Sequence, residues 1–160
     1  MGFDRSGLPR DKLAVLHGCI FEEKCENCGH LVLLDTAVDS ISFAVTGNTC
    51  SLCGSPMRDT LLDWEDPLPE DQLQPAEQHC YEADLVLTLG TSLRIEPAGS
   101  MPQLGDTGDF VIVNLQETPY DAAAKHVIRA PVDLVMETVM RDAMGLTWDS
   151  ETRTWVPKPC

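Results

Sequence analysis

The stretch ADLVLTLG, residues 83–90, is a run of apolar and β-favouring residues that ends at a glycine. Such near-continuous apolar runs are typical of strands buried on both faces of a parallel sheet. A second run, FVIV at residues 110–113, ends at Asn114, and we expect a third, short strand at residues 126–128. The three runs together predict an α/β fold built on parallel strands.

Helical patterns precede and follow these strands along the sequence. Residues 70–82 predict a helix that precedes the first strand. Residues 132–144 carry apolar side chains at three-and-four spacing, and Gly145 follows as a stop signal, which predicts an amphipathic helix whose methionines belong to the core. Near the start of the chain, residues 9–16 predict a short helix. The tail, residues 147–160, has no periodicity and is left unassigned.

Two C-x-x-C pairs are separated by 21 residues, and each is followed directly by a glycine. The four cysteines are Cys25, Cys28, Cys50 and Cys53. Glycine permits the left-handed backbone typical of zinc knuckles, and four thiolates satisfy the tetrahedral preference of zinc. A closed shell of this kind leaves no position for a water ligand, so we expect one structural zinc ion in a ribbon-type module. Two redox disulfides, or a coincidental spacing, are the alternative interpretations.

The composition limits the partners that the protein can have. Its 160 residues include 26 acidic and 11 basic ones, which gives a formal charge of −15. This charge opposes direct binding to nucleic acids, and it would favour a lysine-rich partner or serve only solubility. The sequence has neither a signal peptide pattern nor an apolar run of about 20 residues. We therefore expect an intracellular protein that does not enter a membrane.

An ordered set of motifs resembles the sirtuin family of NAD-dependent protein deacylases. The motifs are RSGLPR (5–10) with HG (17–18), the two cysteine pairs, MRDT (57–60), WED (64–66), GTSL (90–93), VNLQ (113–116) and a final helix from Val132. The WED and NLQ motifs point to the class IV branch, and the resemblance is closest to sirtuin-six-like proteins. This branch implies a nuclear protein that acts on acyl-lysine in protein substrates such as histone tails.

The resemblance also implies roles for particular residues. His17 is expected to be the catalytic base, because imidazole accepts and releases a proton near neutral pH. Trp64 is expected to line the acyl-lysine channel, although an aromatic residue there could equally belong to the core. The residues expected to contact NAD follow the ends of two strands and begin the last helix. They are Gly90, Thr91, Ser92, Asn114, Leu115, Gln116 and Val132.

Ordinary explanations exist for these positions as well. A histidine at the end of a helix is commonly a cap or a surface residue, and the residues after the strands could simply form strand-to-helix turns. The family also carries a glycine-rich pyrophosphate loop, but this sequence contains no G-x-G-x-x-G. We therefore expect a partial Rossmann-like sheet, with little deacylase activity in the isolated chain. A non-catalytic, zinc-stabilised interaction module is the alternative.

The expected organisation has four parts. Residues 1–18 lead to the histidine motif, and residues 19–57 form the four-cysteine zinc module. Residues 58–146 form the C-terminal half of a Rossmann-like NAD-binding domain, and residues 147–160 form the tail.

Overall fold

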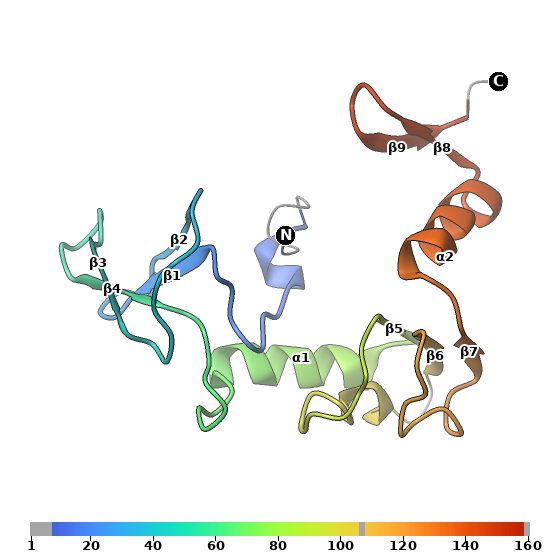
Figure 1. The fold of residues 1–160 in the computed structure, drawn as a ribbon, viewed down its shortest axis with the longest axis horizontal. Helices are drawn as coiled ribbons and strands as arrows, with labels where there is room; N and C mark the ends of the chain where they lie inside the picture. Colours follow the sequence, from blue (N-terminus) through green and yellow to red (C-terminus); the bar gives the residue numbers. More distant parts are fainter. Residues whose placement is uncertain (1–7, 106–107, 159–160) are drawn as a thin grey trace. The chain divides into compact units, whose positions relative to one another are not determined.

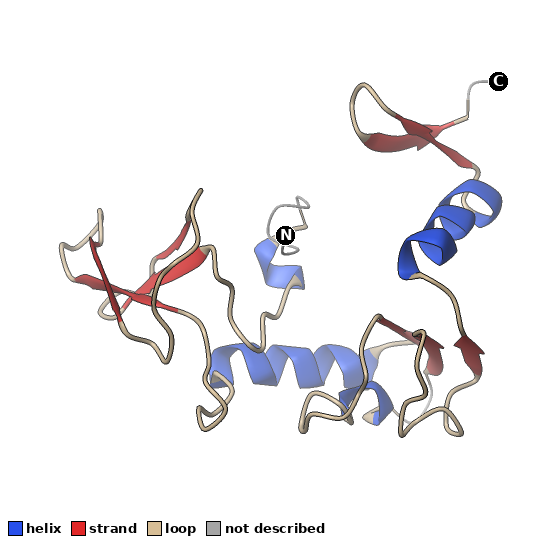
Figure 2. Cartoon of the chain, viewed as in Figure 1, coloured by secondary structure: helices blue, strands red, loops and turns tan. Residues whose placement is uncertain are grey.

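The computed structural model describes residues 8–105 and 108–158. The chain divides into two compact units, residues 1–76 and residues 77–160. The boundary falls within helix α1 (Glu70–Glu82), which has the bounds expected from the sequence. Figure 1 follows the order of the elements along the chain, and Figure 2 separates helices from strands. The units are described one at a time.

The first unit contains a four-stranded antiparallel sheet in the order β2-β1-β4-β3. Its strands are β1 (Glu22–Cys25), β2 (Leu31–Leu33), β3 (Val45–Thr49) and β4 (Pro56–Asp59). The central pair sets Cys25 opposite Met57 and Glu23 opposite Asp59. This register brings the strand that enters the first cysteine pair against the strand that leaves the second pair.

The core of this sheet is very small. Cys25, Cys50 and Met57 form its buried apolar cluster, and Val32 packs against them. Two of these four side chains belong to the candidate metal ligands. Because so little apolar surface is buried, the folding of this segment depends on what holds the cysteines together.

The prediction of a helix over residues 9–16 is wrong for most of that range. Only a 3₁₀ turn, η2 (Arg10–Lys12), is present, and Leu13 is already extended. Eight residues are too few to form a stable helix by themselves. Here the backbone N–H of Val15 donates to the side chain of Gln72, at 3.0 Å, so this segment is fixed by a tertiary contact.

The second unit confirms the parallel sheet. Strands β5 (Leu85–Leu89), β6 (Asp109–Val113) and β7 (His126–Ile128) pair in parallel and in sequence order. Because parallel strands share their direction, the residues that follow β5 and β6 lie at the same edge of the sheet. These are the residues expected to contact NAD.

One face of this sheet is covered, and on the other face strand β5 is open. On the covered face, Leu93, Phe110 and Ile112 are buried, and Val86 and Tyr120 pack against them. On the open face, every second residue of β5 is exposed. The exposed fractions are 57% for Leu85, 40% for Leu87 and 36% for Leu89. For β5, the sequence pattern of a strand buried on both faces is therefore met on only one face.

The last helix forms where its periodicity predicts, but its methionines are not core residues. Helix α2 (Val132–Thr138) continues into a π-helical segment, η4 (Val139–Ala143), and Gly145 ends it with φ of +66°. Met136 and Met140 are only half-buried, and Met144 is 60% exposed. The spacing predicted an apolar face correctly, but no described residue of α2 or η4 is buried.

The unassigned tail contains a β-hairpin. Strands β8 (Leu146–Asp149) and β9 (Thr154–Pro157) pair in antiparallel register, with Trp148 opposite Trp155. The two indole rings meet edge to face, with their centroids 5.7 Å apart. Hairpins depend on such cross-strand pairs, and the pair becomes visible only once the register is known.

Candidate functional site

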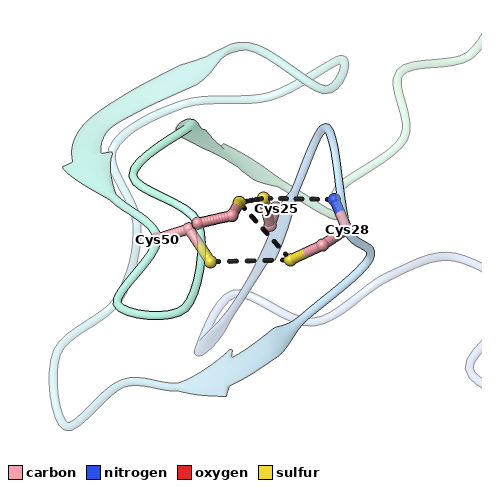
Figure 3. Close-up of side chains that lie close together, drawn as sticks. Cys25, Cys28 and Cys50 are labelled. Carbon is pink, nitrogen blue, oxygen red and sulfur yellow. Dashed lines mark hydrogen bonds between the residues drawn. The ribbon is translucent and has the colours of Figure 1, made fainter.

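The four predicted cysteines converge on one point in the first unit. Their sulfur atoms all lie within 4.8 Å of one another. Individual Sγ–Sγ distances are 3.5 Å for Cys25–Cys53 and 3.6 Å for both Cys28–Cys50 and Cys28–Cys53. In Figure 3 the sulfur atoms of the labelled cysteines point toward one another. Four sulfurs at 2.3 Å from a tetrahedral zinc ion are separated by about 3.8 Å, so the cluster has the size that zinc requires.

Two matching backbone turns bring the sulfurs together. Gly29 has φ of +70° and Gly54 has φ of +73°, as expected for the residue after each pair. Their N–H groups donate to the carbonyl oxygens of Cys25 and Cys50, at 3.1 and 2.8 Å. Each C-x-x-C-G segment therefore forms a tight turn that presents both of its sulfurs on one side.

The electrostatics of the cluster favour a bound cation. The side chain and the backbone of Ser55 donate hydrogen bonds that lower the pKa of Cys53 to about 6. A backbone hydrogen bond at His30 lowers the pKa of Cys28, but the neighbouring thiols outweigh it and raise that pKa to about 12. Four adjacent sulfurs cannot all ionise without a positive charge between them, and a divalent cation supplies that charge.

His30 contributes to this site through its backbone. Its carbonyl oxygen accepts the N–H of Cys25 at 2.8 Å. Among the described residues, the group able to hold a metal consists of the four cysteines and does not include this histidine.

His17 lies in an exposed turn of the first unit. Gly18 follows with φ of +78°, and its α-carbon is packed against the backbone of Thr60. The hydroxyl of Thr60 accepts the N–H of Cys19 at 3.1 Å. Residues 5–7 of the same motif lie outside the described residues. The sequence placed Thr60 in the MRDT motif but gave neither Thr60 nor Gln72 a role, because both bonds join segments that are distant along the chain.

The residues expected to contact NAD surround one cavity of the second unit. The cavity has a volume of about 390 Å³, and it lies where β5 and β6 end. Its lining is Gly90, Ser92, Asn114, Leu115, Gln116, Ala130, Pro131 and Val132. A β-carbon built on Gly90 would lie 3.5 Å from Val132 Cγ2. The structure thus brings together six of the seven residues that the sequence singled out for this role.

Thr91 is the exception, since it does not line the cavity. Its hydroxyl accepts the N–H of Leu93 at 3.3 Å and so shapes the loop that follows β5. Leu93 itself has φ of +53° and is buried. The side chain of Thr91 is therefore used within the loop.

Arg129 organises the second loop of the cavity and was missed in the sequence. Its guanidinium donates to the carbonyl oxygens of Asn114 and Gln116, at 3.1 and 2.9 Å. It also pairs with Asp121. The hydroxyl of Thr118, and then Arg129 more weakly, lower the pKa of the Asp121 carboxyl, so Asp121 is charged at neutral pH. No local motif marks this arginine, because the backbone oxygens that it binds belong to the loop after β6, which is distant along the chain.

Trp64 is 87% exposed and lies in a turn of the first unit. The carboxylate of Asp63 accepts the N–H of Trp64 at 2.8 Å, and the carboxylate of Asp66 accepts the N–H of Asp63 at the same distance. The interpretation of Trp64 as a core residue is therefore wrong. Its side chain is available for an external ligand.

A family model and several relatives match this sequence. The Sir2 family model matches residues 4–97, which is more than half of the chain. The chain belongs to the Sir2 family. Sirtuins of other organisms are similar to it over most of its length. NAD-dependent protein deacetylase SRT1 of Arabidopsis thaliana is 51% identical over 140 residues, which cover 85% of this chain and 30% of the relative. Sirt6 of Drosophila melanogaster is 36% identical, covering 86% of this chain and 47% of the relative.

Solved sirtuin structures share the fold. Sir2Tm bound to a propionylated peptide aligns with a TM-score of 0.66 and 29% identity, over 88% of this chain and 59% of that one. A Sir2 homologue in complex with NAD aligns with a TM-score of 0.63 and 27% identity, over 81% of this chain and 50% of that one. This sirtuin chain therefore spans about a third to a half of the curated relatives named above.

Within residues 8–105 and 108–158, no helix combines the length and the apolar content that crossing a bilayer requires.

Proposed function

We propose that this chain is the zinc-binding and histidine-bearing part of an NAD-dependent protein-lysine deacylase. The observation that carries the proposal is the cavity at the ends of β5 and β6, which gathers six residues of the sirtuin motifs. Open parallel sheets bind nucleotides at the carboxyl ends of their strands. A ligand-binding position, a family membership and a four-thiol metal cluster thus support the same activity.

The cavity suits the adenosine end of NAD. Gly90 has no side chain to crowd a ligand, and Ser92 and Asn114 offer polar groups to ribose or phosphate oxygens. Val132, at the start of α2, offers an apolar surface for a base. Arg129 holds the Asn114–Gln116 backbone in place, so the polar groups keep their positions before a ligand arrives.

We assign one structural zinc ion to the four cysteines. A complete thiolate shell has no open coordination position, so the metal would stabilise the first unit and would not activate water. The small core of that unit agrees with this role.

In the proposed reaction, His17 is the general base. When bound, NAD would supply the ribose carbon to which the acyl oxygen of the substrate adds, and nicotinamide would leave as the carbon–nitrogen bond to that carbon breaks. The imidazole of His17 would then take a proton from a ribose hydroxyl and release it later. The His17 side chain is exposed, as a group that exchanges a proton with an external ligand must be.

The substrate class is an acyl-lysine in a protein. Solved relatives are described as bound to acetylated or propionylated peptides. In this chain the exposed Trp64 could contact the aliphatic part of an acyl-lysine, and the charge of −15 would attract lysine-rich segments. Histone tails and a nuclear location are the corresponding proposals from the sirtuin-six-like branch.

The second candidate function is a zinc-stabilised interaction module without catalysis. It is favoured by the lack of a G-x-G-x-x-G motif in the 160 residues, since backbone donors of such a loop normally hold the pyrophosphate. Calorimetric titration of the chain with NAD separates the two. Micromolar binding that weakens on replacing Asn114 with Ala supports the enzyme, and the absence of heat supports the module.

The catalytic role is tested by His17→Ala in a protein that contains both halves of the NAD site. One such protein is a chimera in which this chain replaces the matching residues of Arabidopsis SRT1. We expect release of nicotinamide from NAD and an acetylated peptide to fall at least about a hundredfold, because removing a general base typically costs that much. Zinc content should remain at one ion per chain. His30→Ala is the control, and a rate above about a tenth of the parent would contradict the role.

A further inference from the structure

The turn that carries His17 is held at both of its ends by hydrogen bonds from distant parts of the chain. Before the turn, the N–H of Val15 donates to Gln72 Oε1 at 3.0 Å. After it, the N–H of Cys19 donates to Thr60 Oγ1 at 3.1 Å, and the Thr60 hydroxyl also lies 3.4 Å from the carbonyl oxygen of Cys19. The two donors are four residues apart, with the histidine between them.

Packing closes the space beneath the turn. A β-carbon built on Gly18 would lie 1.8 Å from the carbonyl oxygen of Thr60 and 2.9 Å from Cα of Leu61. The backbone of residue 18 therefore rests directly on the backbone of residues 60 and 61. Only glycine, which has no β-carbon, allows two backbones to come this close. The contact therefore fixes the distance between the His17 turn and the backbone of residues 60 and 61.

The support is itself fixed by a buried carboxylate. Asp59 is 1% exposed, and its Oδ1 accepts the N–H groups of Phe43 and Leu61, at 3.2 and 3.0 Å. Residue 60 thus follows directly on this buried anchor, which is also the last residue of β4. Strand β4 pairs with β1 through Met57 and Cys25, so this support is continuous with the strand that carries the first metal ligand.

We infer that Thr60 and Gln72 are positioning residues for His17. They set the direction of the imidazole by fixing the backbone at residues 15 and 19, and they do not touch the reacting atoms themselves. The inference rests on the proposed role of His17 as general base. It adds two residues, one after β4 and one in the first turn of α1, to the set that the reaction requires. A general base must be held within hydrogen-bond reach of its proton, so loss of either bond would misplace it.

The test is NMR spectroscopy of the zinc-loaded chain, with the His17 ring signals assigned by His17→Gln. Thr60→Val keeps the shape of the side chain and removes the hydroxyl, and Thr60→Ser restores it. We expect Thr60→Val to raise hydrogen exchange at the Cys19 amide at least tenfold. Order parameters at residues 16–18 should fall from about 0.85 toward 0.6, the values that separate rigid from flexible backbone. The His17 ring signals should move, and Thr60→Ser should return all three readouts to the parent values.

Matched variants keep the result interpretable. Thr36→Val alters an exposed threonine of the same unit and should change none of these signals. Gln72→Leu should act on the Val15 amide and on the His17 ring, and Gln72→Glu, which retains an acceptor, should rescue both. Zinc content verifies that each variant is folded. If Thr60→Val loses zinc, the Gln72 pair still decides the question.

Unchanged exchange at Cys19 and an unmoved His17 ring in Thr60→Val, or unchanged Val15 and His17 signals in Gln72→Leu, would overturn the inference. These readouts report where the histidine lies and not what it does. If the NMR signals respond as expected but His17→Ala retains deacylation, then Thr60 and Gln72 still position His17. In that case only the proposed catalytic role of His17 is wrong.

Discussion

Single sulfur atoms determine whether the first unit can fold. Cys25 is 2% exposed and belongs both to the metal cluster and to the small core with Met57. We predict that Cys25→Ser loses zinc and unfolds residues 19–57, because metal binding supplies most of the folding free energy of such segments, on the order of 10 kcal/mol. Elemental analysis and circular dichroism measure both effects. Cys160→Ser, which lies outside the two C-x-x-C pairs of the sequence, should behave like the parent, and stoichiometric zinc in Cys25→Ser would contradict the assignment.

Gly18 and Gly47 allow the cost of backbone strain to be separated from the cost of steric overlap. Gly18 and Gly47 both have positive φ, +78° and +92°, but no described atom lies within 4 Å of the β-carbon position of Gly47. Gly47→Ala should therefore cost only the backbone strain, about 1–3 kcal/mol. Gly18→Ala adds the overlap with Thr60 and should cost about 2–6 kcal/mol in total. Urea unfolding of zinc-loaded protein measures the difference, and equal losses would show that the contact with Thr60 is unimportant.

At the scale of elements, the β8–β9 hairpin is closed by a carboxylate. Asp149 accepts the backbone N–H of Glu151 and the hydroxyl of Thr152, both at 2.8 Å. The Thr152 hydroxyl, followed by the backbone N–H groups, lowers the pKa of Asp149. A lowered pKa means that the charged carboxylate stabilises the hairpin above the pKa of an unfolded aspartate, about 3.9. That contribution is lost as the pH falls through the lower value of the folded state.

The corresponding prediction concerns Thr152→Val. Removing the hydroxyl should raise the NMR titration midpoint of the Asp149 carboxyl toward about 3.9. The near-ultraviolet signal of the Trp148–Trp155 pair should then be lost at a higher pH than in the parent. Thr147→Val, on the same strand as Asp149, is the control. An unchanged midpoint in Thr152→Val would mean that the hydroxyl does not stabilise the ionised form.

At the scale of the whole molecule, an acidic chain carries an open apolar sheet face. Leu85, Leu87 and Leu89 point to the same side of β5, and all three are exposed. Exposed apolar strands of this kind favour association. We predict that Leu85→Thr combined with Leu87→Thr lowers the apparent mass of the chain in sedimentation experiments. Leu52→Thr, at a leucine that is 71% exposed in the first unit, should not do so. Identical sedimentation of parent and double variant would exclude this face as the cause of association.

Local chemistry allowed much of this protein to be predicted from its sequence. The C-x-x-C-G pairs predicted a four-sulfur cluster, because ligand spacing and the left-handed glycine are properties of five consecutive residues. The apolar runs predicted β5, β6 and β7, and the helix over residues 70–82 was predicted at its observed bounds. The order of short motifs predicted the family. The strand-end residues then met at one cavity because parallel strands must end on the same side of their sheet.

Only the tertiary structure decided the features that depend on contacts between distant segments. Residues 13–16 are not helical, because Val15 bonds to Gln72 and eight residues cannot hold a helix alone. The hairpin at the end of the chain depends on a register that sets Trp148 against Trp155, and the Arg129 clamp depends on carbonyl groups of a neighbouring loop. Periodicity predicted that the last helix has an apolar face, but burial requires a covering element, and for Met144 the described structure provides none. Spacing along the chain determines which residues can share a face or a ligand, whereas burial and long-range hydrogen bonds depend on which other segments arrive there.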